Sequence, residues 1–422
     1  MYFAIETIDQ LSRLEPQSSA FLHLIPNNYG YHPKLASVCA YYYRANDKGY
    51  IISVNHSDCF SLDNQAVLEF INAHQTVYVL DKKYHSHFIK HKNLVECDLL
   101  YQRTDRSFTN LQAEFDRLHR ADPELNSLVP IVKHYEHCEA LYNQYADSLG
   151  RHANCNSVIE AYSYVESNPI RIDRSKFFDS YAVGCEAFSI QGDLIYNQYN
   201  LGNQTGRPTN SFNGVNFLAI TKDESHRSCF LPTNDYLVEF DFDAYHLRLI
   251  ANEVNYSFGV DSVHKYLGKQ YFNKEELTED EYKESKTISF RNLYGGVPEA
   301  HQSIPFFKQM STLSKTLSEG CEPGHTMELP TGIKLKRDFD MGDSKLLNYY
   351  VQNLETKRNA EKILKLKQLL VGKATKLCLI TYDAFLFDYS LEDGKQLLIE
   401  IKKILEEDNM KVKHKFAKNY FL

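Results

Sequence analysis

The sequence predicts a chain of several domains that combines the α/β and α+β classes, and two groups of segments carry that prediction. Residues 19–80 hold short β-branched and aromatic runs around one helical stretch, which is typical of an α/β domain. In the C-terminal half, strand-like runs at 236–242 and 376–388 flank a series of helices, which is typical of an α+β domain. The chain has 422 residues, enough for two or three domains of roughly 150 residues each.

The elements of the N-terminal half follow from runs of apolar and polar residues. We expect strands at 20–25, 35–43, 50–54 and 76–80, and a helix at 66–73. Residues 111–165 are expected to be mostly helical. Asn168-Pro169 should end that stretch, because proline cannot continue a helix and restricts the residue before it. Strand signals return at Ser189-Ile190.

The C-terminal half alternates between helices and strands. After the strand at 236–242, helices are expected at 243–252, at 261–318 with breaks at Gly295-Gly296 and Pro298, and at 348–370. A hairpin of strands should follow at 376–388, then a helix at 391–406 and a short tail that ends at Leu422.

Net charge argues against a surface broadly coated with nucleic acid, because the formal value is −8. Residues 331–376 nevertheless hold 11 Lys and Arg against 5 Asp and Glu, a net of +6 (11 − 5). Enzymes that act on nucleic acids are often acidic overall with one basic cleft, since only the cleft touches phosphates. This segment fits such a cleft and fits a solvated helix face equally well.

Cysteine spacing and hydropathy indicate the cellular compartment of the protein. The nine cysteines stand singly with no C-x-x-C pair, which favours a reducing compartment. No apolar run reaches the ~18 residues that a membrane span needs. The first residues, Met1 to Glu6, have no basic region and no secretion-signal layout. We therefore expect a cytoplasmic protein that does not associate with membranes.

Three stretches carry the chemistry. Asp241 and Asp383 each stand at the edge of an apolar, strand-like run. Lys286, Phe290 and Tyr294 are four residues apart and so share one face of a helix. Two carboxylates that share divalent cations, with a helix that carries a cation and aromatic rings, are the parts needed to hold a nucleoside triphosphate and transfer a nucleotidyl group.

The same stretches resemble the motifs of a known family. In chain order they are Thr205-Gly206-Arg207, Asp241 to Arg248, Tyr282 to Gly295, and Tyr382-Asp383-Ala384. This series is similar to T-G-R-L-S-S, D-Y-S-x-x-E-L-R, R-x-x-x-K-x-x-x-F-x-x-x-Y-G and H-D-E of family A DNA polymerases, the DNA polymerase I-like group. Residues 348–352 resemble the N-x-P-x-Q start of a helix in that family. The resemblance covers roughly residues 160–422, and the Leu247-Arg248 pair fixes Asp241 as the metal ligand.

The resemblance implies a right-hand polymerase fold with a palm and fingers, and a template-directed DNA polymerase that uses two Mg²⁺ ions. Asp241 and Asp383 would bind the metals, with the Phe242 carbonyl as an extra ligand, and Lys286 would act on the triphosphate. The implied substrate-binding residues are Phe290, Tyr294, His246, Lys283 and Arg248, of which Arg248 would also support the palm. The implied residues for primer–template DNA are Arg207, Thr205, Gln352 and Asn348.

Departures from the family pattern fall at functional positions. His246 stands where the family has the glutamate that excludes the ribose 2′-hydroxyl, which puts discrimination between dNTPs and rNTPs in question. Ala384 removes the second carboxylate of H-D-E. Tyr282 replaces the fingers arginine, with Lys283 beside it as a substitute cation, and Pro208 replaces a leucine.

Spacing predicts a reduced thumb. Asn168 to Asp173 resembles the segment that opens the thumb region of the family, and only 34 residues (207 − 173) separate Asp173 from Arg207. A long helical hairpin does not fit in that length, so we expect a weak grip on the duplex and a partner protein that restores processivity. The expected domains are an exonuclease-like domain at 1–115, a helical linker and reduced thumb at 116–200, and palm and fingers at 201–422, with the fingers at about 255–325.

The N-terminal domain faintly resembles the 3′–5′ exonuclease domain of the family, in a degenerate RNase H-like form. The first strand lacks the D-x-E pair that would bind metals, while Asp81 and His85 stand near an N-x-x-x-D position and Asp98 near a third. Two-metal hydrolysis needs several converging carboxylates, so we predict no proofreading.

Other groupings have simpler explanations. Zinc could use four of His134, His137, Cys138, His152 and Cys155, but ordinary helix and core positions explain them better. Arg103, Arg106, Arg117 and Arg120 suit a solvated helix face better than a phosphate path. The alternative functions are a gap-filling, translesion or ribonucleotide-tolerant polymerase, and a non-catalytic DNA-binding replication scaffold. A phage origin, and thus a host-cell cytoplasm, fits the small size.

Overall fold

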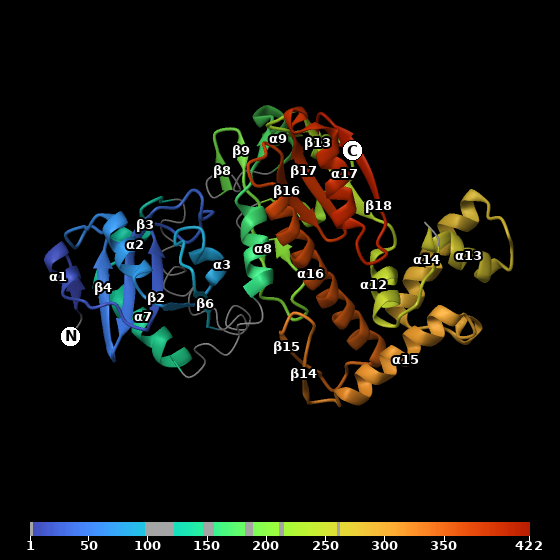
Figure 1. The fold of residues 1–422 in the computed structure, drawn as a ribbon, viewed down its shortest axis with the longest axis horizontal. Helices are drawn as coiled ribbons and strands as arrows, with labels where there is room; N and C mark the ends of the chain where they lie inside the picture. Colours follow the sequence, from blue (N-terminus) through green and yellow to red (C-terminus); the bar gives the residue numbers. More distant parts are fainter. Residues whose placement is uncertain (1–2, 98–121, 147–155, 182–188, 211–214, 260–261) are drawn as a thin grey trace. The chain divides into compact units, whose positions relative to one another are not determined.

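The computed structural model describes residues 3–97, 122–146, 156–181, 189–210, 215–259 and 262–422. The chain divides into two compact units, drawn in Figure 1. Unit 1 holds residues 1–202 and 209–230, and unit 2 holds residues 203–208 and 231–422. The predicted division into three domains remains a prediction. Among the described residues, no helix has the length and apolarity needed to span a membrane.

A six-stranded sheet forms the centre of unit 1, with the order β1-β4-β3-β2-β5-β6. Strands β2, β3 and β4 pair antiparallel, whereas β5 and β6 continue the sheet in parallel to β2. The strands are β1 (Ala4–Ile5), β2 (Ser19–Pro26), β3 (Val38–Ala45), β4 (Lys48–Ser53), β5 (Thr76–Val79) and β6 (Leu94–Glu96). The four strands predicted here are confirmed, although β3 begins three residues later than expected.

Alternation along the strands builds two cores, one on each face of this sheet. Leu22 and Leu24 of β2 pack in one cluster with residues of α2 (Asn64–Asn72). Phe21 and Ile25 of the same strand pack in the other cluster with residues of α7 (Ile131–Tyr145). Because side chains alternate along a strand, one apolar strand can serve both cores. The α/β prediction for this part of the chain is confirmed, including the helix at α2.

The remaining elements of unit 1 are short. The helices are α1 (Ile8–Ser12), α3 (Lys82–His85), α6 (Leu125–Leu128), α8 (Asn156–Glu166), α9 (Arg174–Ser180), η3 (Phe217–Ala219) and α11 (Glu224–Arg227). The strands are β7 (Ile170–Ile172), β8 (Ile190–Gln191), β9 (Leu194–Ile195), β10 (Tyr199–Asn200) and β11 (Thr209–Asn210), with β12 (Phe230–Leu231) at the unit boundary. Helix α8 ends just before Asn168-Pro169, as predicted.

Unit 2 is built on a four-stranded antiparallel sheet of order β16-β17-β13-β18. Strand β13 (Tyr236–Phe242) lies between β17 (Ala384–Tyr389) and β18 (Val412–Ala417), and β16 (Lys376–Thr381) forms a hairpin with β17. The predicted strand and hairpin are confirmed. The prediction of a plain tail after residue 406 was wrong, because β18 pairs with β13 along six residues, from Leu237↔Ala417 to Phe242↔Val412.

Helices surround this sheet and extend from it, as Figure 1 shows for α16 and α15. They are α12 (Tyr245–Glu253), α13 (Val263–Phe272), α14 (Glu279–Gly295), η4 (Glu299–His301), α15 (Pro305–Gly320), α16 (Asp343–Leu369), η5 (Leu391–Asp393) and α17 (Gly394–Leu405). A small hairpin of β14 (Thr326–Glu328) and β15 (Lys334–Lys336) precedes α16. One apolar core joins α12, α13, α15 and α16 around Leu247, Leu267, Phe306 and Val351.

Candidate active site

Two neighbouring strands of the unit 2 sheet bring Asp241 and Asp383 to the same edge. Asp241 of β13 is paired in register with Ala384 of β17, and Asp383 immediately precedes Ala384 in the two-residue loop between β16 and β17. The backbone N–H of Phe242 donates to the carbonyl of Asp383 at 2.9 Å. Both aspartate side chains are exposed to solvent. The sheet therefore presents one carboxylate from β13 and one from the turn before the adjacent strand β17.

A residue with left-handed backbone conformation follows Asp241 in the turn after β13, and another immediately precedes Asp383. Ala244 has φ 51° and Tyr382 has φ 61°, although neither is glycine. Each such residue costs of order 1 kcal/mol or more, so the surrounding fold must hold it in place. The Ala244 turn leads β13 directly into α12, and the Tyr382 turn closes the β16–β17 hairpin. Both bends point to a function for this edge of the sheet.

The carboxylates at this edge of the sheet differ in their exposure and in their charged partners. Asp243 is buried, and its oxygens contact Arg248 at 3.4 Å and Lys413 of β18 at 3.3 Å. Asp241 remains exposed. The pKa of Asp383 is raised because surrounding protein partly desolvates it and because the Glu355 carboxylate lies nearby, although its side chain still reaches solvent. A cation at Asp383 would relieve both effects.

Helix α14 presents the predicted cation and aromatic rings on its accessible face. Its N-terminus is closed by a capping box of Thr278 and Glu281, and its buried face is made of Ser285, Ser289, Asn292 and Leu293. Phe290 and Tyr294 are about two-fifths exposed (42% and 43%), and their rings stack with centroids 6.2 Å apart. The Lys286 ammonium lies 4.6 Å from the Tyr282 ring centroid. Lys283 is exposed and lies 3.8 Å from Asp280.

A chain of polar contacts joins α14 to four other parts of unit 2. The Tyr294 hydroxyl lies 2.9 Å from Nδ1 of His246, and Nε2 of His246 lies 2.8 Å from Oε2 of Glu355. Arg207 forms an ion pair with the same Glu355 carboxylate, with Nε 2.9 Å from Oε2. The Arg207 guanidinium also lies over the Tyr382 ring at 3.7 Å. The chain links α12, α14, α16, the Arg207 loop and the turn that carries Asp383.

Glu355 is the buried anion of this chain. Its side chain is 2% exposed. Burial alone would raise the pKa of Glu355, but His246 and Arg207 outweigh it and lower the pKa below its ordinary value. The carboxyl is therefore ionised at neutral pH and accepts hydrogen bonds from both partners.

The Thr205-Gly206-Arg207 loop packs tightly on α16. Asn353 donates from Nδ2 to the Thr205 carbonyl at 2.8 Å. Gly206 has φ +68°, and a Cβ there would come within 2.6 Å of Ile333 and 2.8 Å of Asn353. Only glycine fits both the backbone and the space. The Thr205 carbonyl thus attaches the loop to α16, and the Arg207 side chain reaches Glu355.

One face of α16 carries a polar stripe. Asn348, Gln352, Glu355 and Asn359 follow each other at spacings of four, three and four residues, which repeat on one helix face. Asn348 donates to the Tyr294 carbonyl at 3.1 Å, and Asn359 donates to the Tyr382 carbonyl at 2.8 Å. Gln352 is partly exposed. The family resemblance indicated Asn348 and Gln352 but not Glu355 and Asn359, which the same spacing places on this face.

Arg248 of α12 is held against the turn that follows β13. It is buried, and its Nε donates to the Asp243 carbonyl at 3.0 Å while an Nη donates to the Asn409 carbonyl at 3.3 Å. These contacts fit the supporting role expected for Arg248. Among the cations predicted to contact a substrate, Lys286 and Lys283 of α14 are the more accessible ones.

Unit 1 holds the residues considered for an exonuclease-like site. Asp81 follows β5 and accepts from the Tyr84 N–H at 3.0 Å, so its carboxylate caps α3. His85 Nε2 accepts from the Leu24 N–H of β2 at 2.9 Å. The ring centroids of His23 and His85 lie 5.5 Å apart. Burial lowers the pKa of both histidines. The described residues contain no group of three or more His, Cys, Asp or Glu side chains arranged to hold a metal.

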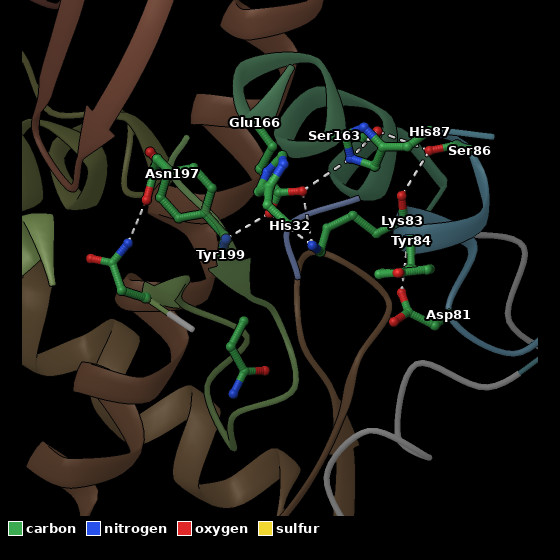
Figure 2. Close-up of polar contacts among 12 residues, drawn as sticks. His32, Asp81, Lys83, Tyr84, Ser86, His87, Ser163, Glu166, Asn197 and Tyr199 are labelled. Atoms are coloured by element: carbon green, nitrogen blue, oxygen red, sulfur yellow. Dashed lines mark hydrogen bonds and ion pairs between the residues drawn. The ribbon is translucent and has the colours of Figure 1, made fainter. Parts of the chain in front are cut away.

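A second buried carboxylate, Glu166 of α8, organises the neighbouring part of unit 1 (Figure 2). Its oxygens lie 2.7 and 2.9 Å from Nζ of Lys83, 3.3 Å from His87 and 2.6 Å from the donating N–H of Tyr199. Burial alone would raise the pKa of Glu166, but Lys83 and His87 lower it to about 2. Burial lowers the pKa of the adjacent His32 to about 3. Both oxygens of Glu166 are thus engaged by groups of unit 1, whereas Nε2 of His32 is buried without a hydrogen-bond partner among the described residues.

Several sequence predictions fall on residues that the structure does not describe. Among the candidates for zinc, exonuclease and phosphate contacts, those outside the described residues are Asp98, Arg103, Arg106, Arg117, Arg120, His152 and Cys155. The other zinc candidates belong to α7, where His134 bonds to the Asn126 carbonyl and Cys138 packs in the core of unit 1. The described cysteines are free thiols.

Comparison with solved structures identifies the fold. No protein-family model matches the chain, and no curated protein matches it. The chain is similar in structure to the POL domain of Pol1 from M. smegmatis, which was solved in complex with DNA primer-template and dNTP. The TM-score is 0.72 at 14% sequence identity, over 100% of this chain and 99% of that chain. The chain therefore has the fold of a DNA polymerase domain.

Proposed function

We propose that this protein is a template-directed DNA polymerase of the family A type, which transfers nucleotidyl groups from dNTPs to a primer 3′-hydroxyl. One observation carries the proposal. Asp241 lies at the end of β13 and Asp383 in the turn that leads into the paired strand β17, within the same unit as a helix whose accessible face presents Lys286, Phe290 and Tyr294. The fold supports it, since the similar Pol1 domain was solved with primer-template and dNTP.

The carboxylate pair fits two Mg²⁺ ions. Magnesium prefers hard oxygen donors and is often held by one or two carboxylates, with water and substrate phosphates completing the shell. Asp241 and Asp383 are exposed carboxylates, and the raised pKa of Asp383 marks a place that favours added positive charge. We assign Asp241, Asp383 and the Phe242 carbonyl as ligands. Two such ions, when bound, stabilise the attacking and leaving oxygens of an in-line displacement.

The protein's own residues position the nucleotide. Lys286 offers its ammonium to the triphosphate and can donate a proton to the leaving pyrophosphate. Phe290 and Tyr294 form a stacked pair of rings that suits the sugar and base of the incoming nucleotide. Arg207, Thr205, Gln352 and Asn348 are assigned to primer–template DNA, where Thr205 and Asn348 act chiefly by holding the loop and α14 in place.

Lys286→Gln should lower kcat/KM for dNTP incorporation by about 100-fold, because it removes one preorganised charge from the triphosphate. Single-turnover primer extension measures this loss. Lys315→Gln is the matched control, because Lys315 is an exposed cation of α15 in the same unit. Equal rates for Lys286→Gln and the wild type would remove Lys286 from the mechanism.

We further propose that the N-terminal part is a degenerate exonuclease domain without proofreading. Strands β4, β3, β2, β5 and β6 have the order and directions of an RNase H-like sheet, with three antiparallel strands followed by two parallel ones. Asp81 is engaged as a helix cap, and β2 carries His23 in place of a carboxylate pair. The reduced thumb, a processivity partner, a phage origin and a cytoplasmic location remain parts of this proposal.

Primer extension tests the proposed function. Wild-type protein with Mg²⁺ should extend a primed DNA template with dNTPs, and EDTA should stop it. A parallel reaction with rNTPs measures what His246 permits: efficient incorporation would favour the ribonucleotide-tolerant alternative, and strict use of dNTPs would exclude it. Magnesium-independent DNA binding with no extension by either substrate would favour the non-catalytic scaffold.

A further inference from the structure

Glu355 occupies a position that no motif of the sequence assigned. It lies on α16, beyond the Asn348–Gln352 segment, in a helix rich in charged residues. Yet its carboxylate is almost completely buried and contacts two side chains from other segments, His246 and Arg207. Burying a carboxylate costs folding free energy unless its charge is paired. We therefore expect this arrangement to have a function besides packing.

The chemistry of a carboxylate fixes one proton on His246. An ionised carboxylate only accepts hydrogen bonds, so Nε2 of His246, 2.8 Å away, must donate to it. In the tautomer that carries its proton on Nε2, Nδ1 is an acceptor for the Tyr294 hydroxyl, 2.9 Å away. Arg207 pairs with the same carboxylate, so Glu355 has a cationic partner besides the ring. The rotamer of Tyr294 on α14 thereby depends on a residue of α16.

We propose that Glu355 is a positioning residue of the nucleotide site, which sets the tautomer and orientation of His246 and through it the position of Tyr294. The inference rests on the proposed polymerase function. His246 and Glu355 act as one unit, in which α12 supplies the imidazole and α16 supplies the carboxylate. Selection of the sugar of the incoming nucleotide then depends on the pair and not on His246 alone.

Glu355→Gln tests the pair with little change of shape. An amide has one accepting oxygen, whereas the carboxylate serves Arg207 with both oxygens and His246 with one of them. Either orientation of the amide turns its NH₂ towards a donor. We expect KM for dNTPs to rise by about tenfold, the ratio of dNTP to rNTP incorporation to change, and kcat to fall less.

A double variant makes the test reciprocal. His246→Glu alone places a second carboxylate beside Glu355, so extension should fall by more than in Glu355→Gln, because two like charges cannot both be buried there. His246→Glu combined with Glu355→Gln should recover at least tenfold over His246→Glu alone, since the new amide can donate to the new carboxylate. Glu361→Gln is the control, because Glu361 lies on α16 and pairs with Arg358 at the surface.

The results separate this inference from the proposed function. Glu355→Gln kinetics equal to those of Glu361→Gln, or a double variant no better than His246→Glu, would overturn the inference in an active polymerase. If the wild type does not extend primers, ¹⁵N-histidine NMR of the protein alone still tests it. The His246 ring signals, assigned by their loss in His246→Gln, should show a proton on Nε2. A proton only on Nδ1 would overturn the inference.

Discussion

Asp383→Asn and Asp241→Asn should each lower primer extension by roughly 1,000-fold or more. The substitutions keep the shape of the side chain but remove a charge from a site whose two cations contribute several kcal/mol to the transition state. Asp241 and Asp383 lie at one edge of the β13–β17 pair, so neither can substitute for the other. Rapid-quench extension with saturating Mg²⁺ measures the loss, and higher Mg²⁺ should recover only part of it.

Glu392→Ala is the control for those two variants. Glu392 is an exposed carboxylate in the same unit, in η5 just before α17, and its substitution should leave the extension rate within a factor of about two, since surface substitutions of this kind rarely exceed 0.5 kcal/mol. Melting temperatures of all three variants separate lost chemistry from lost folding. Near-normal extension by Asp383→Asn would exclude the carboxylate pair as the metal site, whatever the fold.

Glu166→Gln should destabilise unit 1 by about 3–5 kcal/mol, because it leaves the buried Lys83 without its counter-charge. Hydrogen exchange of amides in α3 and α8 measures this, since it reports on unit 1 separately from unit 2. The matched control is Glu136→Gln, which breaks the exposed pair with Lys133 on α7 and should cost less than about 1 kcal/mol. Equal exchange in the two variants would contradict the assignment of Glu166 as the stabilising anion.

The same carboxylate should make unit 1 sensitive to acid. The folded pKa of Glu166 is lowered to about 2 from an ordinary value of 4.5. A lowered pKa stabilises the folded state at pH values above the ordinary one, by roughly 3 kcal/mol here. This stabilisation is lost as the pH falls from about 4.5 towards 2. Acid unfolding should therefore be less steep in Glu166→Gln than in the wild type.

The sequence could predict the strands that carry the two aspartates because those strands are apolar. Strands β13, β16 and β17 are short, largely buried runs rich in apolar and aromatic residues, and turn residues separate β16 from β17. Strand β18, Val412–Ala417, was missed for the opposite reason. Three of its six residues are Lys or His, and most of its side chains are exposed, so it has the pattern of a charged tail until β13 provides its pairing partner.

Glu355 shows why the site itself was only partly predictable. A glutamate among lysines in a long helix has the pattern of a solvated residue, and its burial depends on Arg207 and His246, which are far away in the sequence. Local patterns contain no information on such distant partners. The helical spacing from Asn348 and Gln352 was the one local sign that Glu355 shares their face. The Glu166 cluster was missed for the same reason, since Lys83 and His87 belong to another segment.

The division of the chain into units also limits how the protein can be dissected. Residues 203–208 belong to unit 2, although unit 1 supplies the chain on both sides of them. A fragment that begins at Leu231 would therefore lack Arg207, and of the two side chains described as pairing with Glu355 it would keep His246 alone. Gly206 and Thr205 would no longer fill the place against Asn353. No single cut of the backbone can separate two complete units, so they are expected to be inherited, expressed and degraded together.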